Sequence, residues 1–205
     1  MSAAHCTYGS WAVFAFLGCD DRRYGECDQV HAVLGPRNII NHEGYDPDEL
    51  FDGNDLSLLR LPVRANLNNR VRLICMPSLP APTTGEEMLI SGFGYTKEGG
   101  TISPVLKEGA MSTVDDSYCQ WKWEYPISED TLCTVPGENN TQVFFGDSGG
   151  YGGAFVDGKA VQWGVVSFGP QHLNAGIPVI FTEVYDFRQW IYETTSSKIS
   201  RPRRF

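Results

Sequence analysis

The amino-acid sequence predicts an all-β fold, either a sandwich or a barrel. Glycine and proline, with 22 and 12 copies among 205 residues, interrupt the chain at short intervals, and the apolar runs between them are brief. Many short strands separated by turn residues are typical of sandwiches and barrels. Hydrophobic residues make up 41% of the chain, enough for a packed core, which argues against disorder. The length is that of one large domain or of two closely packed sub-barrels.

Nine apolar runs have the length and the neighbouring turn residues of strands. In chain order they are residues 11–17, 30–34, 38–40, 56–61, 88–93, 105–111, 154–156, 160–167 and 179–184. Their succession along most of the chain is the main support for the all-β class.

Two segments are expected to be helical. Residues 115–123 follow Thr113, which we expect to cap the amino-terminal end of that helix. Residues 186–194 carry apolar side chains at helical spacing, so one face of this second helix is expected to pack on the core. The proline-rich residues 77–84 are expected to form an extended connector between two halves of the chain.

The charge of the chain argues against two classes of partner. The formal net charge is −9, which disfavours binding to nucleic acid and to an anionic membrane surface. No apolar run approaches the ~18 residues that a membrane-spanning helix needs. The basic residues 201–205 are expected to be a solvated, disordered end.

Three short segments carry residues suited to nucleophilic catalysis. His5 follows two small residues, Asp55 stands at the start of an apolar run, and Ser148 lies in a glycine-rich loop. A serine hydroxyl is a weak nucleophile at neutral pH and needs a base within hydrogen-bonding reach. Histidine can supply that base, because its ordinary pKa lies near the working pH, and a buried carboxylate orients the ring.

Glycine beside the serine has a second use. Without a side chain at Gly146, its backbone N–H can join the N–H of Ser148 in binding a developing oxyanion. Removing one such donor costs about 2.7–4 kcal/mol of transition-state stabilisation where this has been tested by mutation.

These segments resemble those of the chymotrypsin/trypsin family of serine proteases. The matching motifs are Ala-Ala-His-Cys, Asn-Asp-x-x-Leu-Leu and Gly-Asp-Ser-Gly-Gly. Their order, His then Asp then Ser, separates this family from subtilisins and α/β-hydrolases. The resemblance implies two packed six-stranded antiparallel Greek-key barrels, a short intermediate helix and a carboxy-terminal helix. It implies one peptidase domain over residues 1–205: a partial amino-terminal barrel (1–80), a carboxy-terminal barrel (81–184), a helix (185–196) and a tail (197–205).

The resemblance also implies roles for individual residues. His5 would be the general base, Asp55 its orienting carboxylate and Ser148 the nucleophile, with the amides of Gly146 and Ser148 as the oxyanion hole. Asp147 would pair with a new amino terminus released by cleavage of a precursor. The strand that pairs with the substrate backbone would contain Ser167, Phe168 and Gly169.

The expected specificity pocket departs from the pattern of trypsin-like relatives. Gln142, six residues before Ser148, stands where an aspartate would bind Lys or Arg, so we do not expect cleavage after basic residues. Val179 stands where relatives often have glycine, which predicts a shallow pocket for a small or medium uncharged side chain. The alternative is that Val179 packs outside the pocket. Phe144 replaces a half-cystine whose partner is also missing.

The six cysteines indicate an oxidising compartment and hence secretion, although the chain shows no signal peptide. The resemblance implies a Cys119–Cys133 disulfide, and Cys19 and Cys27 could close the loop between them. Cys6 and Cys75 have no evident partner here, and the resemblance would tie both to a segment upstream of Met1.

We expect no cofactor and no metal ion. An acidic loop containing Asp20, Asp21 and Glu26 could bind calcium, but a solvated loop is the preferred interpretation. Asn139 begins an N-glycosylation sequon. Expected partners are polypeptide substrates and protease inhibitors, and the protein is expected to be a monomer.

The leading hypothesis for function is therefore a secreted serine endopeptidase. A second hypothesis is a non-catalytic homologue that binds a partner through the same surface, although all three triad residues are present. A third is an inactive, amino-terminally truncated chain, because Met1 falls inside the histidine motif.

Overall fold

The computed structural model describes residues 1–23, 25–49, 51–82, 84–173 and 175–199, with side chains as far as residue 196. The expected disordered end at residues 201–205 lies outside the described residues. Among the helices that are described, none is both long and apolar enough to span a membrane.

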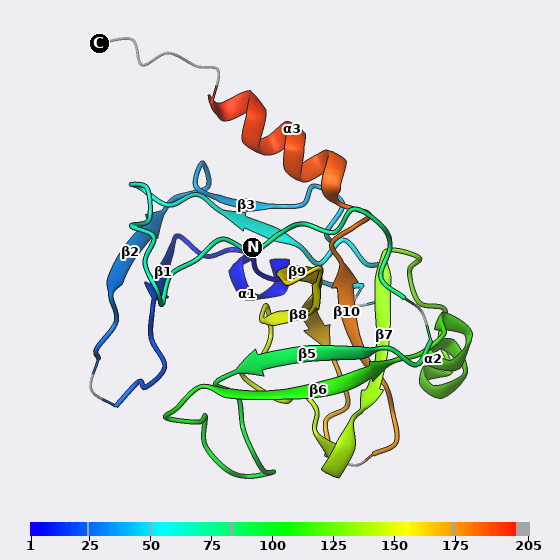
Figure 1. Cartoon of the computed structure of the whole chain (residues 1–205). Coiled ribbons are helices and arrows are strands. Elements are labelled where there is room, and N and C mark those ends of the chain that lie inside the picture. The colour runs from blue at the N-terminus through cyan, green and yellow to red at the C-terminus, as the bar shows by residue number, and fades with distance from the viewer. Residues whose placement is uncertain (24, 50, 83, 174, 200–205) are drawn as a thin grey trace.

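The second half of the chain forms a closed, six-stranded antiparallel barrel (Figure 1). Its strands are β5 (Glu87–Gly92), β6 (Lys107–Thr113), β7 (Thr131–Pro136), β8 (Tyr151–Val156), β9 (Lys159–Phe168) and β10 (Val179–Glu183). They follow the order β10-β7-β6-β5-β8-β9 around the barrel. Closure pairs the edges that an open sheet would expose.

Strand β7 is the barrel strand that sequence analysis missed, because threonines interrupt its apolar pattern. Thr131 and Thr134 are buried, and their hydroxyls donate to the backbone oxygens of Ser128 (2.7 Å) and Val179 (3.1 Å). Those hydrogen bonds offset the cost of burying the hydroxyl groups, so a partly polar segment can lie inside the barrel.

The first half of the chain contains two separate two-stranded antiparallel sheets. Strand β1 (Ala12–Leu17) pairs with β2 (Gln29–Leu34), and β3 (Ile39–Asn41) pairs with β4 (Ser57–Leu59). A single helical turn, α1 (Ala4–Thr7), which the sequence did not indicate, precedes them. In Figure 1, α1 lies between the β1–β2 hairpin on the left and the barrel. The expected β class is thus confirmed, with one closed barrel in the part of the chain that the structure describes.

Both expected helices are present, with different ends. Helix α2 (Asp116–Trp123) is capped by Asp115, whose carboxylate accepts the N–H of Ser117 at 2.9 Å. The prediction that Thr113 caps this helix is wrong, because Thr113 is the buried last residue of β6 and accepts the N–H of Glu86. Helix α3 extends over Arg188–Ile199, and a single 3-10 turn, η1, covers Glu138–Asn140.

Three buried apolar clusters hold these elements together. The first fills the barrel around Phe181, which is fully buried. The second joins both halves of the chain to α3 and comprises Ala3, Leu56, Leu58, Val165, Val184, Phe187 and Ile191. The third lies beneath α2 and includes the Cys119–Cys133 disulfide. The second cluster matters most for function, because it packs the segment before His5 and the residue after Asp55 against β9 and the residue that follows β10.

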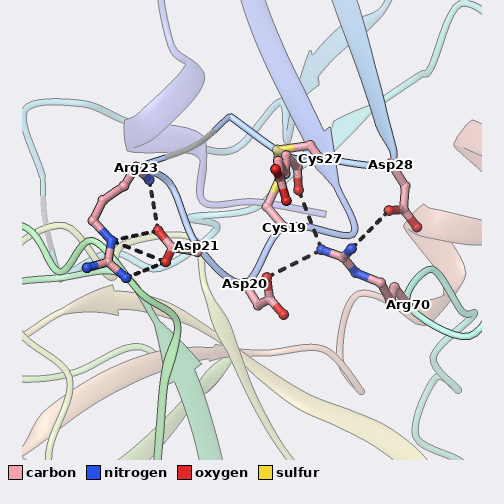
Figure 2. Close-up of a disulfide and its surroundings, with 8 residues drawn as sticks. Cys19, Asp20, Asp21, Arg23, Cys27, Asp28 and Arg70 are labelled. Atoms are coloured by element: carbon pink, nitrogen blue, oxygen red, sulfur yellow. Dashed lines mark hydrogen bonds and ion pairs between the residues drawn. A yellow bond between two sulfur atoms is a disulfide. The ribbon is translucent and has the colours of Figure 1, made fainter.

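The second disulfide, Cys19–Cys27, closes the loop between β1 and β2 (Figure 2). The carboxylates around it pair with arginines: Asp21 with Arg23, and Asp20 and Asp28 with Arg70. No group of three or more His, Cys, Asp or Glu side chains among the described residues is placed to hold a metal ion. Cys6 and Cys75 are exposed free cysteines in the structure.

The connector at residues 77–84 is tied to the barrel through a buried carboxylate. Ala81 is buried, and its N–H donates to the side chain of Glu183 at 2.7 Å. Burial raises the pKa of Glu183 from 4.5 to about 7, even though the hydrogen bond from Ala81 opposes that rise. The folded protein therefore holds this proton more tightly than the unfolded chain does.

This carboxylate predicts a pH-dependent stability. Because the pKa of Glu183 is higher in the folded state, the free energy of unfolding should fall as the pH rises from 4.5 to about 7. Glu183→Gln keeps the acceptor for Ala81 and should remove up to about 3 kcal/mol of that pH dependence. Urea unfolding of both proteins at pH 5, 6 and 7.5 measures the difference. If the free energy of unfolding changed with pH to the same extent in both proteins, the prediction would be contradicted.

Candidate active site

His5 and Asp55 are in direct contact although fifty positions separate them in the sequence. The backbone N–H of His5 donates to Asp55 Oδ1 at 2.8 Å, and His5 Nδ1 lies 2.7 Å from Asp55 Oδ2. The first bond places the histidine backbone and the second orients its ring. With its proton on Nδ1, the imidazole leaves Nε2 free to accept a proton.

Small residues bring His5 to this place. Ala3 and Ala4 are fully buried, and Ser2 forms an antiparallel bridge with Ser57, the first residue of β4. The hydroxyl of Ser57 also donates to the backbone oxygens of Ser2 and Ala3, each at 3.2 Å. Larger side chains at these alanines would not fit, and the bridge between Ser2 and Ser57 holds the start of α1 close to β4.

Asp55 is 4% exposed and receives two hydrogen bonds from the barrel. Ser167 Oγ, at the end of β9, donates to Asp55 Oδ2 at 2.6 Å. Thr182 Oγ1, on β10, donates to the backbone oxygen of Asp55 at 2.9 Å. A buried carboxylate needs such donors, because an unpaired charge in the interior is strongly disfavoured.

The contact between His5 and Asp55 moves both pKa values. Hydrogen bonding to Asp55, with a contribution from Cys6, raises the pKa of His5, although partial burial of the ring acts the other way. Burial acts to raise the pKa of Asp55, but the hydrogen bonds from His5 and Ser167 and the charge of His5 hold it below its ordinary value. The contact thus stabilises the imidazolium that forms whenever the ring takes up a proton.

Ser148 lies in an exposed turn between the buried residue Val143 and β8. Gly146 has a positive φ of 91°, which favours glycine. The N–H groups of Gly149 and Gly150 donate to Val166 and Asp147. Among the residues that the structure describes, the N–H groups of Gly146 and Ser148 donate to no protein group. Both are therefore available to an oxyanion.

The structure brings the serine loop against the histidine segment. A side chain at Gly149 would collide with Ser2 and lie 3.5 Å from Cys6 Sγ. His5 Nε2 lies 3.4 Å from Cys6 Sγ, and within the described residues no hydrogen bond joins His5 to Ser148. Catalytic hydrogen bonds are often long before substrate binds, so this geometry remains compatible with a base and a nucleophile.

A pocket of about 160 Å³ opens beside Ser148. Its lining residues come from the serine loop and the end of β9, and none is charged: Val143, Phe144, Phe145, Ser148, Val166, Ser167, Phe168, Gly169 and Pro170. Ser167, Phe168 and Gly169, which the sequence predicted to contact substrate, are among the lining residues. The pocket is walled mainly by apolar side chains.

Gln142 and Val179 do not line this pocket. Gln142 lies beside a different cavity of about 100 Å³ with Asp147, and its buried Nε2 has no hydrogen-bond partner among the described residues. Val179 is 1% exposed, belongs to the barrel core and lies behind Gly169. The structure therefore favours the alternative that Val179 packs outside the pocket.

Asp147 is held by two backbone amides. Its Oδ1 accepts the N–H of Gly94 at 2.7 Å, and its Oδ2 accepts the N–H of Phe144 at 3.0 Å. The first bond ties the serine loop to the segment after β5, and the second lies within the loop. They also satisfy a carboxylate that is only partly exposed.

An aromatic cluster beside Phe168 was not predicted from the sequence. The ring of Phe168 makes edge contacts with Phe51, at 5.1 Å between centroids, and with Trp123, at 5.4 Å. Tyr125 stacks obliquely on Phe51 at 4.6 Å. The concentration of aromatic residues in the loop before Asp55 and at the end of α2 was the available signal, but nothing in the spacing indicated that they meet.

The chain is similar to known proteins along nearly its whole length. The sequence model of a family described as Trypsin matches residues 1–191. Trypsin-1 of Astacus astacus is 34% identical over 197 aligned residues, covering 93% of this chain and 81% of that protein. Chymotrypsin-like elastase family member 1 of Canis lupus familiaris is 28% identical over 203 residues, covering 96% and 77%. The suppressor of tumorigenicity 14 protein homolog of Bos taurus is 29% identical over 201 residues, and this chain spans 23% of its length.

The His5–Asp55 contact gives a prediction that can be tested without measuring enzyme activity. Asp55→Asn removes the charge and should lower the pKa of His5 toward its ordinary value of 6.5, because the carboxylate no longer stabilises the imidazolium. An NMR titration of the imidazole C–H signals measures this. Asp21→Asn, which alters an exposed pair with Arg23, is the control. An unchanged His5 pKa in Asp55→Asn would show that the contact does not control the ring.

Proposed function

Since the chain belongs to the trypsin family of serine proteases, we propose that it is a serine endopeptidase that hydrolyses peptide bonds through an acyl-enzyme on Ser148. The observation that carries the proposal is the His5–Asp55 pair, supported by Ser167, beside a serine loop with two available amides. These residues come from both halves of the chain and have the chemical roles that acyl transfer requires.

The proposed reaction proceeds in two steps. Ser148 Oγ attacks the substrate carbonyl while His5 Nε2 takes the hydroxyl proton, and the amides of Gly146 and Ser148 bind the oxyanion. His5 then gives the proton to the leaving amine, which departs as the acyl-enzyme forms. In the second step His5 takes a proton from water, which attacks the ester, and His5 then returns that proton to Ser148 Oγ as the bond to the acyl group breaks and the acid is released. Asp55 stabilises the imidazolium in both steps and stays ionised.

We propose that the pocket beside Ser148 receives an uncharged side chain of small or medium size. Its walls include Val143, Phe145, Val166 and Phe168, and no carboxylate lies among its lining residues. A lysine or arginine side chain would lose its hydration there without gaining a charged partner.

Asp147 is proposed to link activity to a precursor cleavage. Its carboxylate now accepts the N–H groups of Gly94 and Phe144, and a new amino terminus would offer it a full positive charge instead. Exchange of partners at Asp147 would move the neighbouring amides of Gly146 and Ser148. The two disulfides fit an extracellular protein, and we propose secretion.

One observation favours a second candidate function. His5 Nε2 contacts Cys6 Sγ and not Ser148, so the triad is not fully assembled in this structure. The alternative is a non-catalytic homologue that binds polypeptides along Ser167, Phe168 and Gly169. The two functions differ in whether Ser148 reacts.

A fluorophosphonate probe tests that reactivity. The folded protein should be labelled on Ser148, Ser148→Ala should not react, and His5→Ala should react at least about 100-fold more slowly because the general base is lost. Peptide mass spectrometry identifies the labelled residue, and Ser78→Ala, at an exposed position, is the control. Labelling that persists in Ser148→Ala would exclude Ser148 as nucleophile, and absence of labelling in the unaltered protein would favour the binding function.

A panel of peptides that differ only at the residue before the scissile bond tests the pocket. Alanine, valine and leucine peptides should have kcat/KM values at least about 100-fold higher than lysine and arginine peptides, since burial of an unpaired charge costs several kcal/mol. Equal or faster cleavage after lysine would contradict the proposal.

A further inference from the structure

The turn that precedes Asp55 is held by a side chain from the other half of the molecule. Asp130, the residue before β7, accepts the N–H of Asn54 on its Oδ2 at 2.7 Å. Gly53 and Asn54 both have positive φ angles, 75° and 57°. Two consecutive residues in the left-handed region are unfavourable for an ordinary chain, so this turn needs support from its surroundings.

Close packing accompanies that hydrogen bond. A Cβ atom added to Gly53 would collide with Asp130 Oδ1 and lie 2.6 Å from Ser128 Oγ. The N–H of Ser128 donates to the backbone oxygen of Phe51 at 3.2 Å. The segment before β7 therefore contacts the turn at Phe51, Gly53 and Asn54, and the carboxylate of Asp130 lies at the centre of the contact.

The barrel fixes the backbone on the other side of Asp55 as well. Thr182 donates its hydroxyl to the backbone oxygen of Asp55, and the N–H of the next residue, Glu183, donates to the backbone oxygen of Asp130 at 2.8 Å. Asp130 is thus anchored to the strand that holds Asp55. The N–H of Asn54, just before Asp55, and the C=O of Asp55 are therefore both hydrogen-bonded to the barrel half of the chain. Together these two bonds set the direction of the Asp55 side chain toward His5.

We propose that Asp130 is a positioning residue whose hydrogen bond to Asn54 fixes the turn that aims Asp55 at His5. Asp130 touches neither His5 nor the pocket, so it acts through Asp55. We expect the acceptor atom, and not the charge, to matter, because Asp130 forms no ion pair among the described residues and its Oδ1 is buried there without a hydrogen-bond partner. An asparagine, which keeps one oxygen acceptor, should therefore serve in its place.

The test compares Asp130→Ala, Asp130→Asn and a control, Asp115→Ala. The control removes a carboxylate that accepts a backbone N–H at 2.9 Å, as Asp130 does, but at the start of α2. The first readout is NMR of His5: its Nδ1 proton signal and its titration. Asp130→Ala should weaken the Nδ1–H signal and lower the pKa of His5, whereas Asp130→Asn and Asp115→Ala should match the unaltered protein.

The second readout is catalysis per titrated active site, and it rests on the proposed function. Asp130→Ala should lower kcat by about 10–100-fold with KM within about twofold, because a misaimed base slows the reaction more than it weakens binding. Asp130→Asn should restore kcat. Thermal unfolding of every variant separates these effects from loss of folded protein, and Asp130→Ser, a smaller change, replaces Asp130→Ala if that variant does not fold.

The outcomes distinguish the inference from the proposed function. An unlabelled and inactive parent protein would overturn the proposed function, while the His5 titration would still decide the role of Asp130. An unchanged His5 signal in both Asp130→Ala and Asp130→Ser would overturn the positioning role. An Asp130→Asn variant that behaves like Asp130→Ala would overturn the hydrogen-bond mechanism, because charge would then be the cause.

Discussion

The buried carboxylate of Asp55 is the constraint on which the site depends. At 4% exposure its charge requires donors, and it obtains them from the backbone and ring of His5 and from Ser167. These donors come from two distant segments of the chain, α1 and the end of β9 in the barrel. Satisfying one charge therefore brings together His5, from the first half of the chain, and Ser167, from the second.

The same constraint explains why the two halves of the chain meet where they do. Leu56, the residue after Asp55, packs in an apolar cluster with Val165 of the barrel, and Asp130 and Thr182 hydrogen-bond to the backbone of Asn54 and of Asp55. The buried charge of Asp55, the shared apolar cluster and two backbone hydrogen bonds therefore all act on residues 54–56. The loop closed by Cys19 and Cys27 makes none of these hydrogen bonds to Asp55 and Asn54, and it carries ion pairs of its own (Figure 2).

Predictions from local pattern succeeded where a segment's residues decided its structure. The apolar runs became strands with ends shifted by a few residues, and both expected helices formed. The failures share a cause. Strand β7 was missed because buried threonines hydrogen-bond to neighbouring backbone, and Asp115 caps α2 because Thr113 is already paired in β6. Partners distant in sequence decided both cases.

The sequence by itself predicted the β class and, through three motifs in one order, the family; it also predicted the two disulfides that the structure contains. Only the tertiary structure decided that Val179 lies in the core and Gln142 beside Asp147, and that Phe51 meets Phe168. Only the structure shows which side chains hold the turn before Asp55. The physical reason is distance along the chain: motifs and strand patterns arise from neighbouring residues, whereas these contacts join segments that only tertiary packing brings together.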